Sequence, residues 1–89
     1  MKSAFASMDN STLNRWLAET LGETPDVPDY CGDIATARHT LERARLHGLV
    51  VMIDAADLDQ PRAIAEAVAR AVEADMHKAL DASPGGFFP

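Results

Sequence analysis

The side chains best suited to chemistry in this sequence are one cysteine and three histidines. Cys31 is the single cysteine, and the histidines are His39, His47 and His77. Cys31 and His39 would lie about two turns apart on one helix, so a Cys–His dyad within that helix is disfavoured. The histidines lack the spacing of a metal-binding pair, and one thiol cannot form a cysteine zinc site. We therefore predict no catalytic residue, no metal site and no cofactor.

Two interpretations of Cys31 stay open. It stands just before a predicted helix, where the helix dipole would lower the pKa of the thiol and make it reactive. Alternatively, it is a small residue that fills the start of the helix. We interpret His39 and His47 as solvent-exposed or interface residues on a basic helix face. An enzymatic or ligand-binding site that includes Cys31 or His39 would have to be assembled across a dimer interface.

Acidic residues are concentrated in two predicted loops. The formal net charge of the chain is -6, which disfavours binding to nucleic acid or anionic membranes because such binding needs clustered Lys and Arg. The acids also lack the spacing of a calcium-binding loop. We expect Arg38, Arg43 and Arg45 to pair with these acidic loops or to line the rim of an interface. The candidate contacts to a protein partner are Glu23, Asp26, Asp29, Asp54, Asp57 and Asp59.

Three segments have the hydrophobic period of amphipathic helices. We expect them from about Thr12, capped by Asn10 or Ser11, to Gly22, from about Gly32 to His47, and from about Gln60 to Leu80. They belong to one domain over residues 1–89, with a core at residues 11–81 and flexible arms at residues 1–10 and 82–89. The residues expected to face the core are Leu13, Trp16, Leu17 and Leu21, then Ile34, Ala37, Leu41 and Ala44, then Ile64, Ala67, Val68, Ala71 and Val72, continued by Met76, Ala79 and Leu80. Arg62, Glu66, Arg70 and Glu73 of the third helix are expected to point into solvent.

The most apolar run in the chain, LVVMI, follows Gly48 and is predicted to be a strand buried on both faces. This gives an α+β fold with three helices and one short strand between the second and third. A lone strand would leave backbone groups unpaired, so we expect a second copy to complete the sheet in a homodimer. The alternative is an all-α three-helix domain in which this run is a loop or helix extension. The dimer-interface candidates are Leu49, Val50, Val51, Met52 and Ile53.

Three short motifs carry a resemblance to a known family. They are LNRWLAETLG in the first helix, PDYCGDIATA at the start of the second and PRAIAEAVARAV in the third. Together they resemble the phage ABA sandwich domain, a small phage and prophage domain of unassigned function. The resemblance implies a small antiparallel sheet between helical layers, which would be truncated here to one strand. Cys31 and Gly32 depart from the family, which usually has serine or threonine at these positions.

These observations favour a small non-enzymatic protein-interaction domain of phage or prophage type, acting as a homodimer in the cytoplasm of a bacterial host. One alternative is an inhibitor of host defence, such as an anti-CRISPR protein, that acts through its acidic surface. The other is the enzyme or ligand-binding domain with a site across the dimer interface. No apolar run approaches the roughly 20 residues that span a bilayer, so no membrane segment is predicted.

Overall fold

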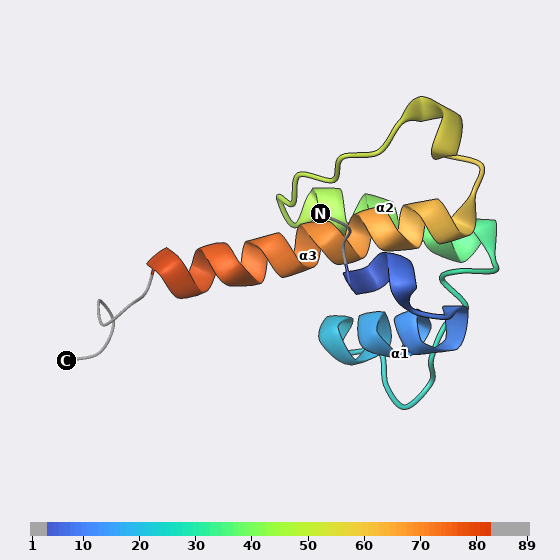
Figure 1. Ribbon diagram of the computed structural model, residues 1–89, viewed down its shortest axis with the longest axis horizontal. Helices are drawn as coiled ribbons and strands as arrows, with labels where there is room; N and C mark the ends of the chain where they lie inside the picture. The colour runs from blue at the N-terminus through green and yellow to red at the C-terminus, as the bar shows by residue number, and fades with distance from the viewer. Residues whose placement is uncertain (1–3, 83–89) are drawn as a thin grey trace.

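Within residues 4–82, three α-helices that run in the same direction form the body of the protein. The computed structural model describes residues 4–82, with side chains described for residues 4–76. In Figure 1 each helix runs from right to left, so the chain has to return across the body after the first and second helices. The elements in order are η1 (Ala4–Ser7), α1 (Asn10–Leu21), α2 (Ile34–Leu46), η2 (Ala55–Asp57) and α3 (Pro61–Ala82), where η marks a short 3-10 helix. The predicted C-terminal arm lies outside the described residues beyond Ala82.

The ends of the helices are set by capping residues. The Asp9 carboxylate accepts a hydrogen bond from the Thr12 N–H at 2.7 Å, so Asp9 caps α1 in place of the predicted Asn10 or Ser11. After α1 the chain turns at Gly22 with φ of 75°, and after α2 it turns at Gly48 with φ of 86°. Glycine enters this left-handed region at little steric cost, which explains both positions.

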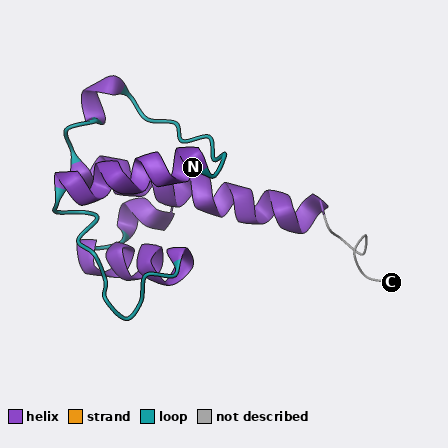
Figure 2. Ribbon diagram, turned by 180° about the vertical axis from the view of Figure 1, so that it is seen from behind, coloured by secondary structure: helices purple, strands orange, loops and turns teal. Residues whose placement is uncertain are grey.

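The core is built around α3, which packs against α2 and α1 (Figures 1 and 2). The predicted core faces of the helices are confirmed for Leu13 and Leu17, for Ala37, Leu41 and Ala44, and for Ile64, Ala67, Val68, Ala71 and Val72, all of which are buried. Trp16, Leu21 and Ile34 are partly buried and pack against this core. The prediction of burial is wrong for Met76, which is 49% exposed, because the C-terminal part of α3 extends past α1 and α2 (Figure 1). The side chains of Ala79 and Leu80 lie outside the described part of the chain.

The segment predicted as an N-terminal arm contributes a core residue. Phe5 of η1 is buried, and its ring meets the Trp16 ring in a T-shaped contact with centroids 4.7 Å apart. Aromatic pairs favour this geometry. The contact therefore fastens η1 onto α1.

The α+β prediction is wrong, because residues 4–82 contain no strand (Figure 2). The described chain is all-helical, as in the stated alternative, and the run from Leu49 to Ile53 is an irregular segment that returns from the end of α2 toward η2. Leu49, Val51 and Ile53 are buried or half-buried, whereas Val50 and Met52 are exposed, so the prediction of burial on both faces is also wrong. A strand needs a neighbouring strand for its backbone bonds, and the described part of the chain offers none.

Helix length and composition also bear on membrane association. Within residues 4–82, no helix is both long enough and apolar enough to cross a bilayer.

Candidate functional site

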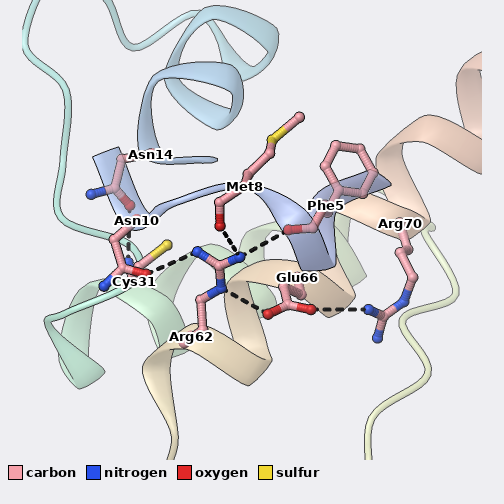
Figure 3. A network of polar contacts seen from close by, with 8 residues as sticks. All are labelled: Phe5, Met8, Asn10, Asn14, Cys31, Arg62, Glu66 and Arg70. Atoms are coloured by element: carbon pink, nitrogen blue, oxygen red, sulfur yellow. Dashed lines mark hydrogen bonds and ion pairs between the residues drawn. The ribbon is translucent and has the colours of Figure 1, made fainter. Parts of the chain in front are cut away.

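The densest group of polar contacts surrounds Arg62 in the first turn of α3 (Figure 3). Its guanidinium donates to the carbonyl oxygens of Phe5 at 2.8 Å and Met8 at 2.6 Å, to Asn10 Oδ1 at 2.8 Å and to Glu66 Oε2 at 2.7 Å. We call these five residues the Arg62 network. A planar guanidinium with several fixed N–H donors suits this task. The network joins η1 and the start of α1 to α3.

Cys31 lies beside the Arg62 network and is buried. Burial raises the pKa of its thiol and outweighs the opposite effect of the nearby Arg62 guanidinium. The Cys31 N–H donates to Asn14 Oδ1 at 3.0 Å, and Asn14 in turn donates to Asp29 at 3.1 Å. His39 is exposed, so it does not share this environment. Since the thiolate is the nucleophile, the geometry favours the interpretation of Cys31 as a structural residue.

A second group of polar contacts holds the linker between α1 and α2. The Tyr30 hydroxyl donates to the Glu23 carboxylate, which also pairs with Arg43 at 3.1 Å. Burial, together with the hydrogen bond to Glu23, raises the pKa of the Tyr30 phenol. A methyl group in place of the Gly32 hydrogen would clash with the Asp29 carboxylate, so glycine leaves room for that carboxylate to turn toward Asn14. Glycine at position 32 therefore has a steric reason within this fold.

The returning segment carries the most exposed apolar side chains outside the helices. Val50 and Met52 are each 81% exposed and alternate with Val51, which is buried against the core. We call Val50 and Met52 the apolar strip. Leu46, at the end of α2, is 85% exposed and lies four residues before the strip. Along residues 50–53, no backbone N–H donates to a backbone carbonyl of another described residue. The strip therefore combines exposed apolar side chains with backbone donors that lack a backbone partner.

Two hollows lie between this segment and α3. The first, about 210 Å³, is lined by Val50 and by Ala71, Ala74 and Asp75 of α3 among others. The second, about 370 Å³, has Met52, Asp54 and Asp57 on the segment side. Its α3 side includes Arg62, Glu66 and Arg70. These α3 positions recur at about one helical turn, so the hollows follow one another along one side of the helix.

Comparison with known proteins adds no relative. No family model, no curated protein and no solved structure matches this chain. The resemblance to the phage ABA sandwich domain therefore stays a prediction, and the sheet that it implies is missing from residues 4–82.

The six predicted partner-contact acids differ in their surroundings. Three of them already have partners within the chain. Glu23 contacts Tyr30 and Arg43. Asp29 accepts a hydrogen bond from Asn14, and Asp59 pairs with Arg38. Asp26 and Asp54 are exposed and Asp57 is half-buried, and none of these three forms an ion pair within the described residues.

The predicted pairing of basic residues with acidic loops is confirmed for Arg38 and Arg43. Arg45 is exposed and has no ion pair with a described residue. His47 is exposed as well, and the side chain of His77 lies outside the described part of the chain. Among the side chains that are described, no three metal-ligating groups come together.

Sequence reasoning missed the role of Arg62, which we expected to point into solvent. Its side chain is only 26% exposed, because η1 folds over it. The spacing of Arg62 and Glu66 signals an ion pair on one helix face, but it contains nothing about η1. Asn14 was also missed, although a buried amide must find hydrogen-bond partners.

Proposed function

We propose that this protein is a small non-enzymatic protein-interaction domain that forms a homodimer through the apolar strip. The observation that carries the proposal is the exposure of Val50 and Met52 on a segment whose alternate residues are anchored in the core. Anchoring by Val51 holds the two side chains in place, which reduces the entropy lost on association. The buried thiol of Cys31 supports a role in binding over one in catalysis.

The expected affinity follows from the size of the strip. Full burial of a valine or methionine side chain contributes about 1.5–3 kcal/mol, and a symmetric dimer would bury four such side chains. Association costs at least about 4 kcal/mol in lost translational and rotational freedom. The total gain of about 6–12 kcal/mol exceeds this lower bound by about 2–8 kcal/mol, which corresponds to a dissociation constant of about 1 μM or weaker, so we expect a dimer that dissociates on dilution.

Sedimentation velocity over a wide range of protein concentration tests this proposal. The 9.6 kDa chain should shift from monomer to dimer as the concentration rises. The double substitution Val50→Ser and Met52→Ser should keep the helical circular dichroism spectrum and lose the dimer. Val27→Ser is the matched control, since Val27 is an exposed valine on the linker between α1 and α2. A wild-type protein that stays monomeric at every concentration would overturn the proposal.

The broader predictions from the sequence extend this proposal. A phage or prophage origin rests on the resemblance alone. An inhibitor of host defence would use Asp26, Asp54 and Asp57, three of the predicted contact acids that form no ion pair with a described residue. A site across the dimer interface that uses Cys31 is disfavoured by the burial of that residue against the Arg62 network.

A further inference from the structure

The two ends of the apolar strip carry opposite charges. Arg45 lies before the strip, at the end of α2, and Asp54 and Asp57 lie after it. None of these three residues forms an ion pair within the described part of the chain. Each is therefore available to a charged group on another molecule.

The α3 side of the hollows shows the opposite order of charge. Asp75 lines the hollow beside Val50, and Arg70 lines the hollow beside Met52. Arg70 already pairs with Glu66, whose nearest carboxylate oxygen lies 3.8 Å from the Arg70 guanidinium. The charges on α3 therefore do not select the orientation of a second copy, which is left to the unpaired charges at the ends of the strip.

From the opposite charges at the two ends of the strip we infer that the partner is a second copy in antiparallel orientation, with the twofold axis near Val51. This inference rests on the proposed function. The axis would set Val50 of one copy against Met52 of the other, at the mouth of the larger hollow. It would also bring Arg45 of each copy toward Asp54 and Asp57 of the other. A parallel arrangement would place like charges together, which opposes association.

The direction of the helices adds an independent argument. All three helices run the same way across the body (Figure 1), so their dipoles add, with the positive ends on one side of the molecule. An antiparallel second copy sets opposite dipole ends side by side. The charges at the ends of the strip and the helix dipoles therefore favour the same orientation.

Charge reversal distinguishes the two orientations. In the antiparallel dimer, Arg45→Glu alone sets the introduced glutamate of each copy against Asp54 of the other. Asp54→Arg alone sets the introduced arginine of each copy against Arg45 of the other. Each variant therefore has two like-charge contacts in its homodimer. Each variant should form its homodimer about tenfold more weakly than the wild type, since each substitution affects both symmetric contacts. When the two variants are mixed, the introduced glutamate of one faces the introduced arginine of the other. The unchanged Arg45 and Asp54 meet at the second contact, so native mass spectrometry should show that the mixed dimer predominates.

Matched controls and alternative outcomes complete the experiment. Arg15→Glu and Asp26→Arg change the net charge by the same amounts at exposed positions on α1 and the linker, and they should leave the dimer unchanged. If the wild type dimerises but the mixed dimer is no tighter than the homodimer of either variant, the antiparallel arrangement is wrong and the proposed function stands. If Arg45→Glu instead pairs preferentially with the wild type, a parallel arrangement replaces it. A monomeric wild type overturns both proposals.

Discussion

Replacing Arg62 with alanine should be among the most damaging single substitutions outside the apolar core. The guanidinium donates four hydrogen bonds, three of which reach η1 and the start of α1. Hydrogen bonds that involve a charged group contribute about 1.5–3 kcal/mol each. Because 26% of the side chain is exposed, water can reach part of the freed oxygens, so the sum is an upper bound. We expect a loss of about 3 kcal/mol in the free energy of unfolding.

Urea denaturation measures this loss, and the structure supplies both a reporter and a control. Trp16 contacts Phe5 of η1, so its fluorescence should change when η1 loosens, and circular dichroism should follow the helices. Arg38→Ala removes an exposed pair with Asp59 and should cost less than about 1 kcal/mol. If Arg62→Ala and Arg38→Ala destabilise the protein equally, the Arg62 network does not hold η1 to α3.

Two further predictions concern the buried titratable groups. The raised pKa of Tyr30 means that the folded state holds the phenolic proton more tightly than the unfolded state, in which the pKa is near 10.0. The contribution of this proton to the free energy of unfolding is therefore complete below pH 10 and is lost as the pH rises above 10. Tyr30→Phe should reduce this alkaline loss in urea titrations, and an unchanged pH dependence would contradict the assignment. The Cys31 thiol should react with an alkylating reagent at least about tenfold more slowly in the folded protein than in urea, since modification requires local opening. Faster reaction than a free cysteine would restore the reactive-thiol interpretation.

The helices could be predicted from sequence because their signal is local. The apolar period of Ile64, Val68 and Val72 identifies the buried side of α3 without reference to any other element. Gly22 and Gly48 mark the helix ends for the same reason, since the requirement for positive φ belongs to a single residue. The helices and their ends could therefore be predicted closely, although the capping residue of α1 is Asp9 and not the predicted Asn10 or Ser11.

The irregular segment and the contacts of Arg62 could not be predicted in the same way, because their causes lie elsewhere in the chain. An apolar run such as Leu49 to Ile53 is equally compatible with a strand, a helix extension or an irregular segment until its neighbours are known. Arg62 looks like a solvent-facing residue until η1 is placed over it. Glu23 and Asp29 were correctly assigned to a loop, but their contacts to other segments required the folded arrangement.

The parallel run of the three helices connects the charge pattern of the sequence to its proposed association. Aligned helix dipoles repel one another, and the chain offsets this by placing Asp9 and Asp33 at the starts of α1 and α2 and Arg43 and Arg45 at the end of α2. Within one copy, Arg43 is neutralised by Glu23, whereas Arg45 has no ion pair with a described residue. The charge separation that stabilises α2 thus leaves a positive charge at one end of the apolar strip, opposite in sign to the acids at its other end. In the antiparallel dimer, a second copy brings its acids toward this positive charge. Arg45, which stabilises the end of α2, would therefore also set the orientation of the dimer.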